Sequence, residues 1–332
     1  CCDALDDYTS YLTPDKLEDL YAMIDGNFVG LGVELKHDPK GLKIVGVIPR
    51  GPADEAGLKV GDRITSVDGH DLVGMGLDES ATRLQGLAGT TVRLEVQHSD
   101  GRRSRATMTR RPIEVQSVAQ ARILDNSAGI GYIQLTGFQK SSTDEMHRAM
   151  AALQDQGLRT LILDLRGNPG GLLNVAVEIA DRFLDKGRIV LTRGRAPGQS
   201  LVYDDTTPAI WRMRTIVLVD HDSASASEIL AGALQENKRA LVVGERSFGK
   251  GSVQSIFALR SVRAGLKLTT AKFYSPTGRG YSEQGVTPDV PVRILAKPVG
   301  DAAGDSEGIP TIEFGRPGED MVLDHALGIS KK

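Results

Sequence analysis

The sequence predicts an α/β protein that carries a small strand-rich domain towards its N-terminal side. From Gly129 onwards, short apolar segments typical of buried strands alternate with helical stretches, which indicates helices layered on a sheet. From Phe28 to about Pro112, short alternating polar and apolar runs are instead separated by Gly, Asp and Pro, as in a small sheet domain. The 332 residues are enough for two or three domains, each with its own core.

The first 26 residues are expected to be helical or turn-rich. Apolar residues recur at helical spacing from Leu17 to Ile24, and Pro14 suits the first turn of a helix. In the strand-rich domain, Asp78 to Leu84 is expected to form a helix with Asp78 as its N-cap. The strands expected there include Val33–Leu35, Leu42–Val45, Ile64–Val67 and Val92–Val96.

The α/β part is expected to contain five buried strands with helices between several of them. The strands are Ile130–Leu135, Thr160–Leu165, Arg188–Leu191, Thr215–Val219 and Leu241–Val243. The helices are Ser142–Gln154, Leu172–Leu184 and Ser225–Leu234. Residues 297–332 are rich in Gly, Pro and Asp with little periodicity, so we expect them to form a loose C-terminal tail.

Composition excludes several classes of protein. The 40 basic and 43 acidic residues leave a net charge of −3, which argues against a nucleic-acid partner. No apolar run approaches the roughly 18 residues that span a bilayer. Cys1 and Cys2 are adjacent and cannot staple a fold. Because the chain opens with Cys rather than Met, we interpret it as a fragment, compatible with removal of an export signal.

The glycine pattern of the strand-rich domain points to peptide binding. Residues 27–112 resemble a PDZ domain, because four glycine-containing motifs occur in the order typical of that domain. The motifs are Gly30-Leu31-Gly32-Val33, Gly51 to Leu58, Gly61 to Ile64 and Val67-Asp68-Gly69. A Gly-flanked loop lets backbone N–H groups converge on a terminal carboxylate beside a strand edge that pairs with the peptide. Each of these glycines alone is more often typical of a tight turn, and it is the ordered set that favours the PDZ interpretation.

The segment Asp220 to Ile229 is the most informative one for chemistry. It follows the buried strand Thr215–Val219 and opens a helix, so Ser225 projects from the sheet end beside free N–H groups that can stabilise an oxyanion. Ser225-Ala226-Ser227-Glu228 also matches a capping box, S-x-x-E, which merely starts a helix. This segment alone favours the cap.

A second segment, around Lys250, shifts the interpretation of Ser225 from a helix cap towards a catalytic residue. Lys250 is bracketed by Gly249 and Gly251, which allow close approach of the backbone, and Gln254 lies four positions on, a spacing that shares a face in strand and helix alike. A solvated lysine is common, but a buried one loses its proton more easily and can act as a general base.

Taken together, Ser225, Lys250 and Gln254 resemble the Ser–Lys–Gln site of the C-terminal processing peptidases, PDZ-containing serine proteases related to the tail-specific protease. Further motifs of that family occur in order, and the resemblance spans about residues 5–293. These further motifs are Leu5 to Pro14, Gly131-Tyr132-Ile133, Asp164-Leu165-Arg166-Gly167-Asn168-Pro169-Gly170-Gly171, and Thr269 to Gly278.

The resemblance implies a fold, a mechanism and the roles of the site residues. The fold would be a crotonase-like (ClpP/crotonase-type) α/β protease domain, residues 113–296, with a PDZ domain inserted at 27–112. Ser225 would be the nucleophile, Lys250 its base and later its acid, and Gln254 would hold the Lys amine in line. The oxyanion donors would be the N–H of Ala226 and a glycine of the Arg166–Gly171 turn, first Gly170 and then Gly171. No metal or cofactor is implied.

Other candidate nucleophiles and sites are less favoured. Ser223 and Ser227 compete with Ser225, but the spacing of the family favours Ser225. His221 is interpreted as a surface loop residue, since no G-x-S-x-G elbow exists. The six histidines show no H-E-x-x-H spacing, which argues against a zinc peptidase.

The expected function is a serine endopeptidase whose PDZ domain engages apolar C-terminal tails of unfolded or tail-exposed proteins. The main alternative is a catalytically idle tail-binding scaffold, and a third is an acyl-CoA enzyme, suggested by fold analogy alone. The resemblance implies a bacterial envelope or periplasmic location and leaves open an activating adaptor and a homo-oligomer. Many relatives have Arg where this chain has Gln85, so coupling of tail binding to activation is not implied here.

Overall fold

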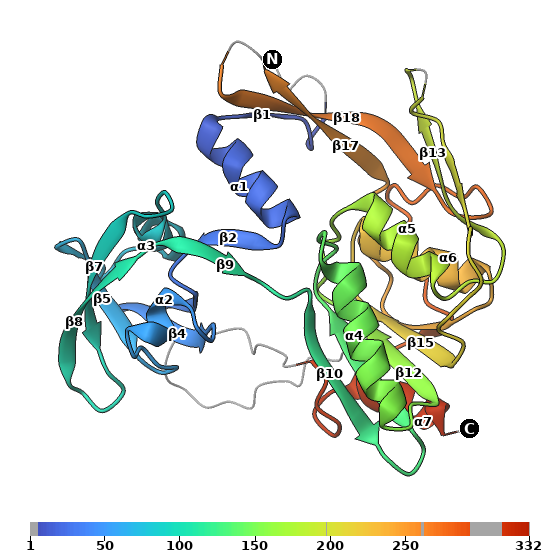
Figure 1. Ribbon diagram of the computed structural model, residues 1–332, viewed down its shortest axis with the longest axis horizontal. Coiled ribbons are helices and arrows are strands. Elements are labelled where there is room, and N and C mark those ends of the chain that lie inside the picture. Colours follow the sequence, from blue (N-terminus) through green and yellow to red (C-terminus); the bar gives the residue numbers. More distant parts are fainter. Residues whose placement is uncertain (1–5, 197, 260–261, 293–313, 332) are drawn as a thin grey trace, which may run out of the picture. The chain divides into compact units, whose positions relative to one another are not determined.

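The computed structural model describes residues 6–196, 198–259, 262–292 and 314–331 (Figure 1). The chain divides into two compact units. Unit 1 comprises Cys1–Leu17 and Gln116–Lys332, and unit 2 comprises Glu18–Val115. Unit 2 is therefore inserted into the sequence of unit 1.

The N-terminal segment contains both the expected helix and a strand that was not expected. Helix α1 (Pro14–Ile24) begins at Pro14, as the sequence predicts. Before it, β1 (Ser10–Leu12) pairs antiparallel with β18 (Ala264–Tyr274) and places Ser10 opposite Lys267. A strand of three residues shows no period of its own, and the distant partner β18 determines it.

In unit 2, the chain enters along β2 (Asn27–Gly30) and leaves along β9 (Arg111–Glu114), and these two strands pair antiparallel. Between them lies an antiparallel sheet in the order β3-β4-β5-β7-β8, with β6 paired to β5. Its strands are β3 (Val33–Asp38), β4 (Gly41–Val47), β5 (Arg63–Val67), β6 (His70–Asp71), β7 (Thr91–Gln97) and β8 (Arg103–Thr109). Alternate residues such as Leu42, Ile44 and Ile64 are fully buried and form the core of the unit.

Two helices complete unit 2, α2 (Pro52–Glu55) and α3 (Leu77–Leu84). The expected helix at 78–84 is confirmed, but Asp78 is not its N-cap. The helix begins one residue earlier, and Gly76 is the N-cap. The C-terminal end of α3 is held by buried Arg110, whose Nε donates to the Leu84 carbonyl over 2.7 Å.

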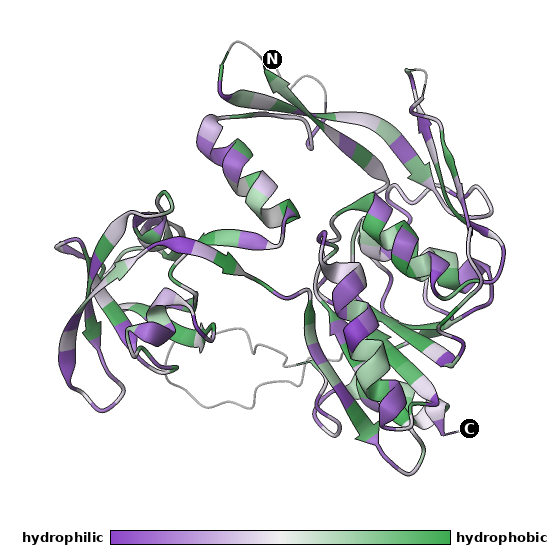
Figure 2. Cartoon of the chain, in the orientation of Figure 1, coloured by the Kyte–Doolittle hydropathy of each residue, from purple (hydrophilic) through white to green (hydrophobic). Residues whose placement is uncertain are grey.

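Unit 1 is built on a six-stranded sheet in the order β10-β11-β12-β15-β16-β19. The strands are β10 (Val118–Asp125), β11 (Ile130–Leu135), β12 (Thr160–Asp164), β15 (Arg214–Val219), β16 (Leu241–Gly244) and β19 (Val290–Pro291). From β11 to β19 neighbouring strands are parallel, while β10 is antiparallel to β11. Figure 2 shows the hydrophobic colouring of β12 and β15, as expected for strands covered on both faces.

Helices lie on both faces of this sheet. One face packs, through residues such as Leu163 and Val217, against α4 (Ser142–Asp155), α5 (Leu173–Asp181) and α6 (Ala226–Glu236). The other face carries Tyr132, Ile162 and Leu218, which pack against α7 (Met321–Ser330). This part of the unit is thus a three-layer α/β/α arrangement, and its strands and helices match those expected from the sequence within a few residues. The expected strand Arg188–Leu191 does form, as β13 (Arg188–Gly194), but in a second sheet.

The loose tail expected for residues 297–332 is wrong at 321–330. There, α7 buries Val322, Leu323 and Ala326, and a helix of ten residues is too short for its pattern to stand out in a Gly- and Pro-rich context. Residues 297–313 of that tail lie outside the described part of the chain.

A second sheet of unit 1 runs in the order β1-β18-β13-β14, with β17 also paired to β18. It contains β13 (Arg188–Gly194), β14 (Val202–Asp204) and β17 (Ser252–Leu259). Within the described ranges, none of the helices has the length and apolar character required to cross a membrane.

Candidate active site

Ser225 occupies a strained turn between β15 and α6. It is the N-cap of α6 and forms the expected capping box with Glu228. Its backbone, however, has φ 57° and ψ −113°, whereas an ordinary N-cap lies in the extended region. Such a conformation is costly for a non-glycine residue and is found mainly at functional sites, including the strand-to-helix turns that expose a nucleophilic serine. The position therefore does more than start a helix.

The structure separates the three serines of this turn. Ser223 is fully buried and donates through Oγ to the Leu165 carbonyl over 2.8 Å. Ser227 is also fully buried and donates to the Asn168 carbonyl over 2.9 Å. Ser225 alone of the three is partly exposed, and its Oγ donates to no other described residue. Since a nucleophile must be reachable, the geometry favours Ser225. His221 is exposed at the surface, as expected.

Lys250 lies on the loop between β16 and β17 and is half-buried. Its Nζ is 4.9 Å from the centre of the Tyr8 ring. Within the described ranges, that amine has no hydrogen bond and no ion pair. Burial, followed by the nearby charge of Lys267, lowers the pKa of Lys250, and Glu228 only partly offsets this. A lysine in this state gives up its proton more readily than one in water.

A single buried carboxylate joins the Ser225 turn to the Lys250 loop. Glu228 is fully buried, and its Oε2 accepts from the N–H of Ser225 (2.7 Å) and from the N–H of Lys250 (2.9 Å). Its Oε1 accepts from the Ser247 hydroxyl (2.6 Å) and from the N–H of Gly249 (2.7 Å). Burial raises the pKa of Glu228, and these four hydrogen bonds oppose that rise. One oxygen atom thus holds the two backbone amides side by side.

The glycine-rich turn after β12 is fixed against the Ser225 turn. Asp220 accepts from the N–H of Gly167 over 3.0 Å, and the Asn168 carbonyl accepts from the N–H of Ala224 over 3.0 Å. Gly170 has φ +101°, and a Cβ there would come within 2.9 Å of both the Ser225 Cβ and the Ala226 nitrogen. Only glycine lets the turn come this close to the serine.

Of the expected oxyanion donors, Gly170 is brought next to Ala226, and Gly171 follows it beside Phe138, so the two glycines are not equivalent. The N–H of Ala226 starts α6 next to Ser225 and, among the described residues, donates to no carbonyl or side chain. The N–H of Gly170, our first choice, already donates to Asn168 Oδ1 over 2.9 Å. The N–H of Gly171 has no acceptor within the described part of the chain. Of the two glycines, Gly171 has the available donor.

Gln254 is not in hydrogen-bonding contact with Lys250 in this structure. Its Nε2 donates to Ser252 Oγ (2.9 Å) and Thr269 Oγ1 (3.2 Å). Because β17 begins only at Ser252, Lys250 belongs to the loop before it, and the argument that positions four apart share a face does not apply. The role of Gln254 stays a prediction.

In unit 2, the four residues expected to bind peptide lie at the edge of the sheet. Gly30 ends β2, and Val33 begins β3, whose one strand partner among the described residues is β4. The carbonyls of Leu31 and Gly32 accept from Ala53 and Ile48, which fixes the intervening loop. The outer edge of β3 is therefore open to an added strand.

Several residues of this site could not be identified as such from the sequence. Glu228 was visible only as half of a capping box, although it also holds the Lys250 loop. Asp220, Asn168 and Tyr8 lie in segments singled out from the sequence, but their individual contacts cross long stretches of the chain and no local pattern predicts them.

The four hydrogen bonds of Glu228 predict a large effect of Glu228→Gln on stability. A carboxamide has only one acceptor oxygen, so two buried donors lose their partner, at about 1–3 kcal/mol each. We expect a correspondingly lower free energy of unfolding in urea. Glu178→Gln is the control, since Glu178 accepts one exposed hydrogen bond, from Thr143. Equal stability of Glu228→Gln and the parent chain would show that the donors find other acceptors.

Comparison with known proteins identifies the family of the chain. Residues 129–292 match the model of peptidase family S41, and residues 43–98 match that of the PDZ domain. A carboxy-terminal-processing protease of Bartonella bacilliformis is 37% identical over 294 residues, which is 87% of this chain and 67% of that protein. A carboxyl-terminal-processing protease of Picosynechococcus is 37% identical over 305 residues, 91% of this chain and 73% of that protein.

Among solved structures, the photosystem II D1 C-terminal processing protease is similar to this chain, with a TM-score of 0.55 and 31% identity over 86% of this chain and 78% of that one. A protein of Bacteroides fragilis described as an S41 protease shares the fold, with a TM-score of 0.65 and 18% identity over 98% of this chain and 86% of that one. The chain belongs to the carboxyl-terminal-processing protease family, serine-type peptidases of family S41 with a PDZ domain.

Proposed function

We propose that this protein is an endopeptidase that cleaves peptide bonds with Ser225 as nucleophile and Lys250 as its base. The observation that carries the proposal is the shared anchor on Glu228 Oε2. Glu228 Oε2 accepts from the backbone N–H of Ser225, which is strained and accessible. It also accepts from the backbone N–H of Lys250, whose pKa is lowered. Nucleophile and base are thus supplied by two loops that one buried group keeps together.

The reaction follows from these positions. Neutral Lys250 accepts the proton of the Ser225 hydroxyl as Oγ attacks the scissile carbonyl, and the tetrahedral intermediate forms. The N–H groups of Ala226 and Gly171, with Gly170 behind them, stabilise its oxyanion. Protonated Lys250 then gives its proton to the leaving amine, which leaves an ester on Ser225. A water molecule, deprotonated by the same amine, hydrolyses that ester.

The lysine side chain must turn before it can act. In this structure its Nζ lies over the Tyr8 ring, and it is not hydrogen bonded to Ser225. A cation–π contact of this kind stabilises the protonated amine by about 0.5–2 kcal/mol, an amount that substrate binding can offset. Gln254 is proposed to hold the amine once it has left Tyr8.

The PDZ domain is proposed to select the substrate. A peptide added to the open edge of β3 would place its C-terminal carboxylate at Gly30-Leu31-Gly32-Val33. Substrates would then be unfolded or tail-exposed proteins with apolar C-termini. We propose that the PDZ domain spans residues 27–112 and that residues 113–296 form a crotonase-like protease domain. We also propose that the protein acts in the bacterial envelope, and that an adaptor or self-assembly activates it.

The proposed nucleophile and base are tested by cleavage of an unfolded reporter with an apolar C-terminus. We expect Ser225→Ala and Lys250→Met each to lower turnover by about 10³-fold or more. Lys272→Gln, an exposed lysine on β18, is the control and should cleave at the parental rate. Binding of the reporter by the parent without cleavage would favour the idle scaffold instead. Full turnover in Lys250→Met would show that the base lies elsewhere.

The lowered pKa of Lys250 predicts the pH dependence of cleavage. Only the neutral amine accepts a proton, so kcat/KM should rise with pH through the pKa of Lys250, below the ordinary range of lysine. Lys267→Gln removes a neighbouring positive charge, which raises that pKa and moves the rise to higher pH. The measurement is the pH–rate profile, with Lys272→Gln as control. The explanation fails if Lys267→Gln leaves the profile unmoved or if both variants shift it equally.

A further inference from the structure

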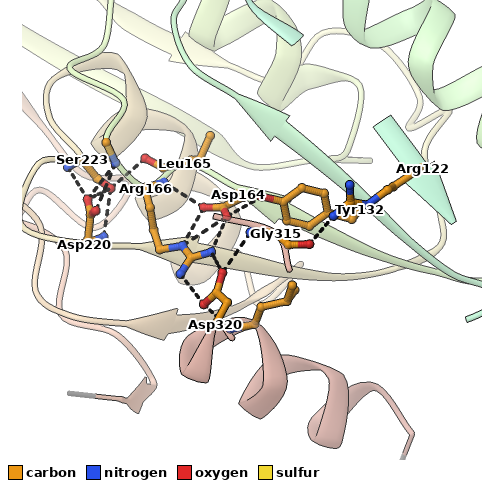
Figure 3. A network of polar contacts seen from close by, with 11 residues as sticks. Arg122, Tyr132, Asp164, Leu165, Arg166, Asp220, Ser223, Gly315 and Asp320 are labelled. Carbon is orange, nitrogen blue, oxygen red and sulfur yellow. Dashed lines mark hydrogen bonds and ion pairs between the residues drawn. The ribbon is translucent and has the colours of Figure 1, made fainter. Parts of the chain in front are cut away.

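A buried ion network lies between the end of β12 and the start of α7 (Figure 3). The Arg166 side chain is fully buried, and its Nη2 lies 2.6 Å from Asp164 Oδ2 and 2.6 Å from Asp320 Oδ2. Its Nη1 donates to Asp320 Oδ1 over 2.8 Å, and its Nε donates to Asp164 Oδ1 over 2.9 Å. Both carboxylates are also buried. The guanidinium is therefore enclosed by two acids, one local and one 154 positions away.

Burial of these charges is costly unless their hydrogen bonds are complete. Burial alone would raise the pKa of Asp320, but the hydrogen bonds and charge of Arg166 bring that pKa below its ordinary value. Tyr132 Oη donates to Asp164 Oδ2 over 2.8 Å and completes the far side of the network. Such a network fixes the positions of its members closely, since any shift leaves a buried charge without a partner.

The glycine turn that faces Ser225 begins immediately after Arg166. The N–H of Arg166 donates to Asp164 Oδ1 over 3.0 Å, so main chain and side chain are held by the same carboxylate. From there the turn runs through Asn168, which holds Gly170 and accepts from the Ser225 segment. Because Gly171 follows Arg166 by five residues in this turn, a displacement of Arg166 would also displace the N–H of Gly171.

The C-terminal segment closes the network from the other face of the sheet. Asp320 is the N-cap of α7 and accepts from the N–H of Leu323 (3.1 Å) and of Gly315 (3.0 Å). The Phe314 ring centre lies 4.3 Å from the Arg166 guanidinium, and this ring is 3.5 Å from where a Cβ of Gly167 would be. The segment 314–331 therefore contacts the arginine and lies beside the first glycine of the turn.

We propose that Asp320 is a positioning residue for catalysis, through which the C-terminal helix α7 sets the place of the oxyanion turn by way of Arg166. The proposal rests on the proposed function, in which that turn supplies an oxyanion donor. Stabilisation of an oxyanion depends on donors already placed at about 3 Å from the developing charge, so a small displacement of the turn reduces turnover more than substrate binding. In this proposal Asp320 and Phe314 act on the turn through Arg166 and do not touch substrate, while the exposed residues of α7 take no part.

Asp320→Asn is the direct test in the full chain. Asparagine keeps the size of the side chain and is an equally good N-cap, so α7 can still form, but the second negative partner of Arg166 is lost. We expect kcat to fall about tenfold to a hundredfold, with KM within about twofold of the parent. Asp324→Asn is the matched control. Asp324 is exposed on the same helix and accepts from Gly318, without contact to Arg166.

A peptide boronic acid resembles the tetrahedral intermediate, so its affinity compared with that of the product peptide separates a displaced oxyanion donor from a general loss of structure. Its affinity should fall in parallel with kcat in Asp320→Asn, while the affinity for the cleaved product peptide stays at the parental value. Both are measured below the midpoint of thermal unfolding of the variant. Should Asp320→Asn not fold, Phe314→Leu removes the ring contact with Arg166 and Gly167 while leaving the ion pairs, and a several-fold loss of the same kind is expected.

The outcomes are separable. Parental kcat and boronate affinity in Asp320→Asn, or a loss of activity equal to the unfolded fraction, would overturn the positioning role. An equal loss in Asp324→Asn would overturn it as well, because the effect would then belong to the helix in general. If the parent chain itself neither cleaves nor binds the boronic acid, the proposed function fails, independently of Asp320.

Discussion

The site depends on one buried carboxylate. Glu228 enters from the first turn of α6 and accepts four hydrogen bonds, two of them from the backbones of Ser225 and Lys250. The serine conformation is strained, and it persists because Glu228 holds its N–H while Asn168 holds the preceding residue, Ala224. Beside this carboxylate, the N–H of Phe248 donates to the Ser223 carbonyl over 3.0 Å, so the serine turn and the lysine loop are joined at two places.

A second set of contacts places the glycine turn against the serine. Asp220 and Ser223 bind the turn from one side, and the Arg166 network binds it from the other. The contacts of Asp220 and Ser223 join the carboxyl ends of the parallel neighbours β12 and β15, whereas the Arg166 network joins the end of β12 to α7. The side chains of Ser225 and Lys250 stay partly exposed, while the glycine turn beside Ser225 is held by the contacts of Asp220, Ser223 and Arg166.

The sequence was sufficient for the strands and helices of the α/β layers, because buried parallel strands and amphipathic helices have strong patterns. The choice of Ser225 as nucleophile came from the resemblance to the family and stays a prediction, although Ser225 is the partly exposed serine of its turn. The sequence could not separate Gly170 from Gly171, because the choice depends on which N–H Asn168 occupies. Strand β1, helix α7 and the Asp320–Arg166 pair depend on partners far along the chain, and no local period reports them.

The central claim is that Ser225 becomes acylated within this prearranged site. The most direct measurement is mass spectrometry of the parent chain quenched in acid during turnover of an activated peptide ester, followed by mapping of the adduct. The account predicts one acyl group on the peptide that contains Ser225, placed on that residue by fragmentation, and no adduct in Ser225→Ala. An adduct on Ser223, Ser227 or Lys250, or one that survives in Ser225→Ala, would contradict it.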